Sequence, residues 1–292
     1  FLRASRYGRG VRSDAVLYYR VHPENWGRIA ARREMHRADQ VKGEIRRGAA
    51  RLCVCCAFGG RLPGLFPRWL EALETAFGQM DIPKPNLFLI DDSPLGFWQI
   101  AAPHLEKLTN LFASIRVDRT FDGVSASERR SDRFATAKRL SIHYNRFLDE
   151  TVDEILWFIE DDIVIPERAG TRLLHLLLDG DLPHAAVAGF YRSRHGNENR
   201  YVASVVNGTR VIHADTLPLT PKTYELTGTG CLMIFRPVCK TPFAPYWKFP
   251  ARDLIVPAHD WYYSWKLHEQ GQPVLLDPEV ICRHYTTESE YL

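Results

Sequence analysis

The segment that most constrains the fold runs from Ile155 to Pro166 and carries three consecutive acids inside an apolar stretch. The residues before the acids are apolar or aromatic, and apolar residues resume after them until the proline. A run bounded in this way is typical of a buried central strand in a sheet. Glu160, Asp161 and Asp162 therefore mark the place where such a strand reaches its end.

Three adjacent carboxylates repel one another and lose hydration when they are buried, so their presence indicates a cation that neutralises them. Oxygen ligands in a row favour Mg²⁺ or Mn²⁺, with a substrate phosphate completing the coordination shell. A plainer interpretation is that the acids end the strand at the surface or cap the next helix. The segment alone leaves both interpretations open.

The charge of the chain is unevenly distributed, although its net value is only +3 over 292 residues. Residues 1–51 hold thirteen Arg or Lys against five Asp or Glu. We therefore expect a basic N-terminal extension over residues 1–48, followed by a mildly acidic body over 49–292. The extension is either a solvated arm or a surface for a polyanion such as nucleic acid or an acidic glycan.

No apolar run approaches the roughly 20 residues that span a bilayer, and the N-terminus lacks the charge and apolar pattern of a signal peptide. The expectation is a soluble, cytoplasmic protein without a transmembrane segment. The six cysteines show no spacing of a secreted disulfide framework. Cys53 and Cys56 satisfy C-x-x-C, but their apolar surroundings favour a buried strand over a zinc or redox site.

Strand-like and helix-like segments alternate along the body. A strand at residues 51–58 is followed by two glycines and a helix that stops near Gly78, and a second strand at 86–90 ends in Asp91 and Asp92. This βαβ order predicts an α/β fold with a mostly parallel central sheet flanked by helices. Ligands of such sheets bind beyond the carboxyl ends of the strands, where these acids and the later ones fall.

A later helix, capped by Ser131 or Asp132, is predicted to turn four side chains inward, namely Phe134, Ala137, Tyr144 and Phe147. Its basic residues, Arg133 and Arg139 among them, are then exposed or directed at a ligand. Residues 201–206 and 210–213 are predicted to pair as a hairpin, which would lie over the site as a lid or as a wall of the acceptor site.

The order of these segments resembles that of the GT-A fold glycosyltransferases, a broad class that uses nucleotide sugars and a divalent metal, and family 2 in particular. The resemblance covers about residues 50–286 and rests on five segments in the family's order. They are the strand ending in Asp91-Asp92-Ser93, the acids at 160–162, Thr227-Gly228-Thr229-Gly230-Cys231, a helix opening on His259-Asp260, and the late His284. It implies a Rossmann-like GT-A catalytic domain over residues 49–292.

The resemblance also implies roles for the acids, since the family's acidic motif is D-x-D or a variant of it. By that likeness Asp162 ligates Mn²⁺ or Mg²⁺, and Glu160 approaches the ribose or the water shell of the metal. Asp161 takes either role if the register shifts by one residue. His284 matches the late histidine that often supplies a further metal ligand.

Asp91 and Asp92 match the acids that meet the base or ribose of the nucleotide. Asp260 matches the general base of inverting members, which takes the proton that the acceptor hydroxyl must lose. Many relatives carry two acids there, whereas this chain has His259 before the aspartate, so both inversion and retention stay open. A plain N-cap of the helix is the alternative role for Asp260.

The implied function is transfer of a hexosyl group from a nucleoside-diphosphate sugar, with UDP favoured, to an acceptor hydroxyl. Arg133 or Arg139 would help the cation offset charge on the departing nucleotide. The acceptor stays open between a saccharide, a protein and a modified base in DNA, the last suggested by the basic extension and the arginines at 192–200. The alternatives are a nucleotidyltransferase, for which Gly59-Gly60-Arg61 would be a minimal phosphate loop, and a non-catalytic nucleic-acid-binding protein on a degenerate transferase scaffold.

Overall fold

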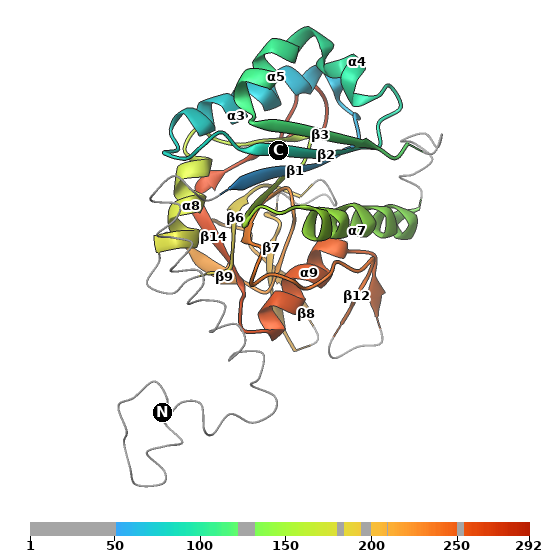
Figure 1. Ribbon diagram of the computed structural model, residues 1–292. Helices are drawn as coiled ribbons and strands as arrows, with labels where there is room; N and C mark the ends of the chain where they lie inside the picture. Colours follow the sequence, from blue (N-terminus) through green and yellow to red (C-terminus); the bar gives the residue numbers. More distant parts are fainter. Residues whose placement is uncertain (1–50, 122–131, 180–183, 194–199, 209, 250–253) are drawn as a thin grey trace.

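The computed structural model describes residues 51–121, 132–179, 184–193, 200–208, 210–249 and 254–292. The predicted extension over 1–48 and the proposed cap Ser131 lie outside these residues. An eight-stranded sheet forms the centre of the described part (Figure 1). In spatial order its strands are β3 (Ser114–Arg119), β2 (Asn86–Asp91), β1 (Leu52–Phe58), β4 (Ile155–Ile159), β11 (Cys231–Phe235), β6 (Ala186–Phe190), β14 (Val274–Ile281) and β9 (Lys222–Tyr224).

The sheet is mostly parallel, as the alternating pattern predicts. Strands β3, β2, β1 and β4 pair in parallel, and so do β6 and β14. Strand β11 is antiparallel to both of its neighbours, β4 and β6, and β9 is antiparallel to β14. The carboxyl ends of β1, β2 and β4 therefore lie along one edge, together with the amino end of β11.

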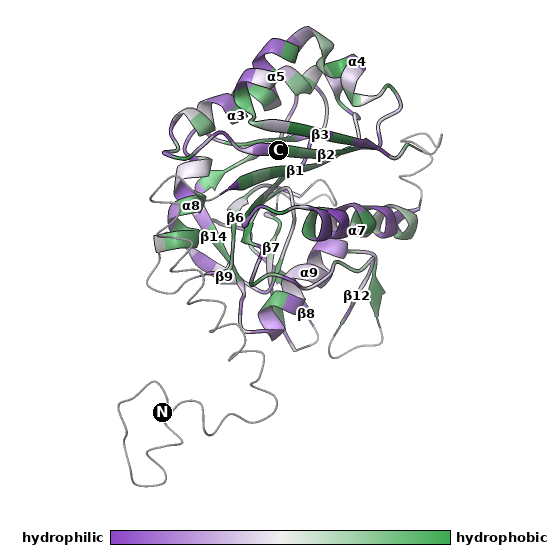
Figure 2. Ribbon diagram, in the orientation of Figure 1, coloured by the Kyte–Doolittle hydropathy of each residue, from purple (hydrophilic) through white to green (hydrophobic). Residues whose placement is uncertain are grey.

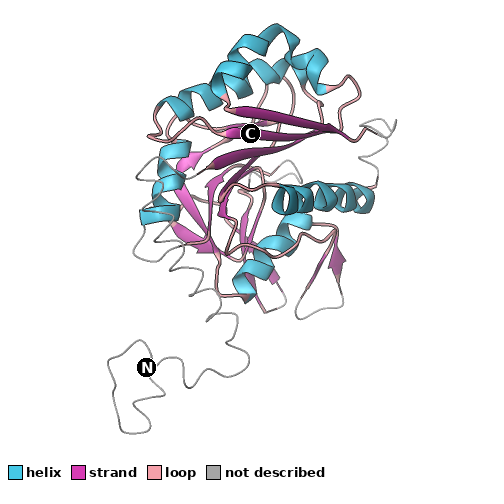
Figure 3. Cartoon of the chain, viewed as in Figure 1, coloured by secondary structure: helices cyan, strands magenta, loops and turns pink. Residues whose placement is uncertain are grey.

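Helices cover both faces of the sheet (Figures 1 and 3). One face carries α3 (Phe66–Gly78), α4 (Phe97–Ala101), α5 (Leu105–Leu111) and α8 (Ala169–Asp179). The other face carries α7 (Arg133–Glu150), α9 (His259–Glu269) and a small sheet of β10 (Leu226–Thr227), β7 (Ala203–Asn207) and β8 (Arg210–His213). Shorter elements are the 3₁₀ turns at Pro63–Leu65 and Ala102–His104 and the pairs β5 (Ile163–Val164) with β15 (Arg283–His284) and β12 (Trp247–Lys248) with β13 (Ile255–Val256).

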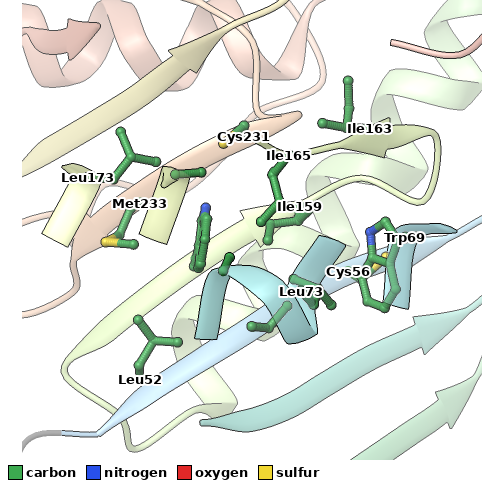
Figure 4. Packing of buried hydrophobic residues seen from close by; sticks show 14 of the residues in the cluster. Leu52, Cys56, Trp69, Leu73, Ile159, Ile163, Ile165, Leu173, Cys231 and Met233 are labelled. Carbon is green, nitrogen blue, oxygen red and sulfur yellow. The ribbon is translucent and has the colours of Figure 1, made fainter. Parts of the chain in front are cut away.

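The buried side chains of β1 alternate between two hydrophobic clusters, one on each face of the sheet. Cys56 packs with Leu73 of α3 in the cluster drawn in Figure 4, whereas Cys53 packs with residues of α7 and α9 on the other face. Successive side chains of a strand point to opposite faces, so cysteines three residues apart cannot share a metal ion. The prediction that the C-x-x-C pair belongs to a buried strand is confirmed, and β1 is mostly hydrophobic in Figure 2.

Helix α7 begins as its sequence predicts. The Oδ1 atom of Asp132 accepts a hydrogen bond from the Ala135 amide at 2.9 Å, which caps the first turn. Ala137, Tyr144 and Phe147 are buried. The predicted inward position of Phe134 is wrong, because the buried stripe begins one turn later and this ring is 52% exposed.

The predicted hairpin is also present, with β7 and β8 pairing in antiparallel register around Gly208, whose φ is +58°. Its sheet partner β10 packs against α9, since the Thr227 amide donates to Ser264 Oγ at 3.1 Å. The hairpin therefore belongs to the layer that carries Asp260. In the part of the chain that the structure describes, no helix is long and apolar enough to cross a membrane.

A closed network of four charged side chains ties β3 to α7. Arg116 and Arg146 each pair with both Asp118 and Glu150. Hydrogen bonds from the two guanidinium groups are the largest cause that lowers the pKa of each carboxyl group. The network therefore stabilises the fold at neutral pH and loses this contribution as the pH falls through the range where the acids gain protons.

We expect Asp118→Asn to lower the free energy of unfolding at pH 7 by roughly 1 kcal/mol, because both arginines lose an ionic partner. The difference from wild type should shrink as the pH falls below the ordinary aspartate range and vanish below the lowered pKa of Asp118, where the wild-type acid is itself protonated. Urea denaturation at pH 7 and at a series of acidic pH values measures this. The control is Asp149→Asn, an exposed acid of α7, and equal losses for the two variants would contradict the network's contribution.

Candidate functional site

The loops that follow β1, β2 and β4 are fastened together at the carboxyl edge of the sheet. The Gly60 amide donates a hydrogen bond to Asp161 Oδ2 at 2.8 Å. Gly60 has a φ of +57°, and a Cβ atom there would lie 2.3 Å from the Cβ atom of Ser93. Only glycine satisfies both the backbone conformation and the close approach. This residue therefore sets the distance between the three loops.

The acidic residues form a tight turn and do not continue the strand. Strand β4 ends at Ile159, and the Ile163 amide donates back to the Glu160 carbonyl at 3.1 Å before β5 begins. The three acids therefore lie directly after the end of the buried strand, where the sequence predicts them. A turn spreads the three carboxylates apart, which reduces the repulsion that an extended segment would impose.

Each acid of this turn has its own partner. Asp161 accepts from Gly60, and Glu160 accepts from Thr229 Oγ1 at 3.0 Å. The hydroxyl of Tyr144 lies 3.4 Å from the same Glu160 oxygen. Burial, followed by the charge of Glu160, raises the pKa of the Tyr144 phenol, so this hydroxyl stays protonated.

Asp162 and His284 face each other across the short β5–β15 pair. Their atoms Oδ1 and Nε2 are 3.7 Å apart, and both residues are 5% exposed. His284 Nδ1 lies 2.7 Å from the Arg192 carbonyl oxygen, which can only accept. Nδ1 therefore carries a proton, and this hydrogen bond orients the ring so that Nε2 faces Asp162.

This pair fits a divalent cation that a substrate helps to hold. Among the described residues, no group of three or more His, Cys, Asp or Glu side chains is arranged to hold a metal. Asp162 and His284 offer one carboxylate oxygen and one imidazole nitrogen, and Mg²⁺ or Mn²⁺ is often held by one or two side chains plus substrate phosphates. The donors present therefore suit a metal that is completed by a diphosphate, and not one enclosed by protein alone.

The two acids after β2 have different positions. The oxygens of Asp91 accept from the Ser93 amide and hydroxyl, from the Phe97 amide at 2.8 Å and from Arg119 at 2.5 Å. These four partners make Asp91 the organiser of the turn between β2 and α4, so a direct contact of its carboxylate with a nucleotide would cost hydrogen bonds.

Asp92 points toward α7, where its Oδ2 lies 2.7 Å from Arg139 Nε and 3.9 Å from His143 Nε2. The structure thus brings together two residues, Asp92 and Arg139, that were predicted separately as nucleotide-binding residues. Arg133 is exposed in the first turn of α7, and it forms no ion pair with the described residues.

Asp260 lies in the first turn of α9 and is not its cap. The N-cap position belongs to Ala258, and Asp260 Oδ1 accepts from the Trp261 amide at 2.9 Å. The charge of Asp260, after burial and the charge of Glu160, contributes to the raised pKa of Tyr191. The charges of Asp260 and Glu160 therefore both act on Tyr191.

Tyr191 is a site residue that the sequence did not indicate. Its hydroxyl oxygen accepts from the Gly230 amide at 2.9 Å, and a Cβ atom on Gly228 would lie 2.0 Å from that oxygen. The glycines of the 227–231 segment thus make room for a tyrosine ring from the end of β6. The ring of Tyr191 also meets the His284 ring edge-on at 5.4 Å.

His143 and His259 are two further residues that sequence reasoning missed. Both are buried on the helical side of the site. Burial lowers the pKa of His259, the charge of Asp260 opposes this, and the nearby His143 adds to the lowering. His259 is therefore neutral at physiological pH. The sequence shows that His259 precedes the candidate base Asp260, but it does not show that the histidine is buried.

No protein-family model matches the sequence, and a search of curated proteins gave no match. Among solved structures, GalNAc-T7 with UDP, GalNAc and Mn²⁺ superimposes with a TM-score of 0.51 at 13% identity, over 82% of this chain and 44% of that one. This chain thus spans less than half of that protein. The likeness confirms the GT-A-like Rossmann fold that the sequence predicts.

Two further structures align with TM-scores below 0.5. A197 from STIV gives 0.47 at 12% identity, over 83% of this chain and 89% of that one. The inositol-1-phosphate CTP transferase from T. maritima gives 0.45 at 13% identity, over 82% and 91%.

We expect Gly60→Ala to destabilise the protein by about 1–3 kcal/mol, since the added methyl group requires both a strained φ and displacement of Ser93. Gly78→Ala is the matched control, because no atom lies within 4 Å of a Cβ there and the residue is helical. That control should be neutral or stabilising by about 0.5–1 kcal/mol. Thermal or urea unfolding of both variants measures the difference, and equal effects would show that Gly60 is not required.

Proposed function

We propose that this protein is a glycosyltransferase that moves a sugar from a UDP-sugar to an acceptor hydroxyl with the help of Mn²⁺ or Mg²⁺. The observation that carries the proposal is the Asp162–His284 pair, buried at the carboxyl edge of the GT-A-like sheet with His284 Nε2 oriented by the Arg192 carbonyl. Such edges are where α/β sheets bind ligands.

In this proposal Asp162 and His284 hold the metal. The metal, when bound, supplies positive charge that stabilises the departing diphosphate. Arg139, already oriented by Asp92, borders the nucleotide from α7. Asp91 supports the loop that receives the nucleotide, and Glu160 lies on the ribose side of the same turn. Arg133 is less well placed than Arg139 to contact the nucleotide, because it is exposed at the start of α7.

Asp260 is the proposed general base. Tyr144 and Tyr191 are poor bases at neutral pH, because burial raises their pKa well above the usual value. Burial also keeps His259 out of contact with solvent. The carboxylate of Asp260 is partly exposed and is held in one orientation by the Trp261 amide. It would take the proton of the acceptor hydroxyl while the sugar carbon is attacked, which implies inversion.

A saccharide is the acceptor that we favour. Trp261 follows the proposed base, and its ring lies 5.9 Å from the ring of His213 on β8 and 5.7 Å from that of Trp247. Aromatic rings of this kind suit the apolar face of a sugar. Transfer to a modified base in DNA rests only on the positive charge of the extension and of the arginines at 192–200, and salt-sensitive binding to duplex DNA would favour it.

Nucleotidyl transfer is the second candidate, because Arg61 of the Gly59-Gly60-Arg61 loop reaches the acidic turn. Release of pyrophosphate from a nucleoside triphosphate and a sugar phosphate, without release of UDP from UDP-sugars, would favour it.

Calorimetric titration with UDP, GDP and their sugars tests the donor site. We expect one nucleotide sugar to bind with Mn²⁺ and to bind at least about tenfold more weakly with EDTA, in Asp162→Asn and in His284→Gln. The control is His175→Gln, an exposed position of α8. Absence of binding by every nucleotide sugar, or equal binding in all variants, would overturn the proposal.

For Asp260→Asn we expect kcat to fall by about 10²- to 10⁴-fold while the nucleotide sugar still binds, because the base is lost and the donor contacts remain. A coupled assay for released UDP measures this once a saccharide acceptor is found. If Asp260→Asn weakened the binding of the nucleotide sugar as well as lowering kcat, Asp260 would belong to the donor site instead.

A further inference from the structure

Arg61 is the first charged residue after β1, and it reaches into the acidic turn. Its Nη2 atom lies 3.2 Å from Asp162 Oδ2 and 3.0 Å from the Tyr285 carbonyl oxygen. The side chain of Arg61 is 22% exposed, and that of Asp162 is 7% exposed. The left-handed conformation of Gly60 and its hydrogen bond to Asp161 direct the chain so that Arg61 takes this position.

The two oxygens of Asp162 therefore have separate partners. Oδ1 faces His284 Nε2, whereas Oδ2 faces the guanidinium group. A buried carboxylate requires a compensating positive charge, since it has lost most of its hydration. Arg61 supplies that charge in the protein without substrate, at the residue that would otherwise attract a divalent cation most strongly.

We infer that Arg61 is a resident counter-charge of Asp162, which competes with the divalent cation in the nucleotide-free protein and turns to the diphosphate when the donor binds. The second half of this inference rests on the proposed function, while the first half needs only the ion pair. A cation next to Asp162 repels the guanidinium group, and an incoming diphosphate attracts it.

The chemistry of arginine suits this exchange of partners. A guanidinium group keeps its charge at any physiological pH and presents a planar set of donors that matches phosphate oxygens. Besides its ion pair with Asp162, Arg61 donates a hydrogen bond to the Tyr285 carbonyl oxygen, which carries no charge. Its partial exposure leaves room for the side chain to turn toward the open edge of the sheet.

A different role for the same residue predicts the opposite result. If Arg61 only oriented Asp162 for the metal, its removal would weaken metal binding, as loss of a partner behind a ligand usually does. Competition predicts that its removal strengthens metal binding. The sign of the change in Mn²⁺ affinity therefore separates the two roles.

The experiment is a titration of nucleotide-free protein with Mn²⁺, in which electron paramagnetic resonance measures the concentration of the free ion. It compares wild type with Arg61→Gln, Arg61→Lys and Arg68→Gln. Arg68 is an exposed arginine of α3 that contacts the Glu288 carbonyl and serves as the matched control. We expect Arg61→Gln to bind Mn²⁺ about tenfold more tightly than wild type, and Arg61→Lys and the control to stay close to wild type.

A second titration adds UDP at saturating Mn²⁺. Here we expect Arg61→Gln to bind UDP about tenfold more weakly, because the contact with the diphosphate is lost. A structural role for Arg61 would not move the two affinities in opposite directions. The thermal unfolding midpoint of each variant shows that the comparison is made on folded protein. Arg61→Met, which also removes the charge and should change both affinities in the same directions, keeps the test decisive if Arg61→Gln is unstable.

Weaker or unchanged Mn²⁺ binding in Arg61→Gln overturns the inference, and so does the absence of Mn²⁺ binding in every variant. Failure of the proposed function gives a different result, in which no variant binds UDP although Arg61→Gln still binds Mn²⁺ more tightly. That result would support competition between Arg61 and Mn²⁺ at Asp162 and contradict the proposed nucleotide-sugar site.

Discussion

The backbone pairing of β5 with β15 brings the two halves of the candidate site together. Ile163 pairs with His284, and the Tyr285 amide donates to the Asp162 carbonyl at 2.9 Å. These main-chain hydrogen bonds fix the separation of the carboxylate and the imidazole before either side chain contributes. Because the contact is made by backbone atoms, it tolerates changes in the exposed side chains around it. The candidate site is therefore held as rigidly as the edge of the sheet.

Three neighbouring carboxylates persist here because each is stabilised in a different way. Asp161 receives a backbone amide, Glu160 a hydroxyl, and Asp162 a guanidinium group. The turn that separates them is short enough to keep all three at the same edge of the sheet. Charge repulsion, which would be largest in an extended strand, is thereby reduced without removing the acids from the site.

The sequence predicted those parts of the fold that have a repeating pattern. The continuous apolar run of β1, the helical spacing of α3 and the cap at Asp132 all follow from local rules, and the order of the acidic segments located the edge of the sheet. Elements too short to show a period, such as α4 and β12, were missed. The partners of Asp91 and the fit of Tyr191 against Gly228 depend on contacts between distant segments. No local pattern encodes those contacts, so the individual roles of the site residues needed the structure.

Strand β11 lies between β4 and β6, although it follows both in sequence. During synthesis β4 emerges before its native partner on one edge, because in the finished sheet β11 lies between β4 and β6 and pairs with both. The apolar edge of β4 therefore stays open until residues 231–235 arrive, which makes closure of the sheet a late and non-local step. The nascent chain is consequently exposed to misassembly at this edge, and a chaperone that covers β4 would have its effect between the emergence of Ile159 and that of Phe235.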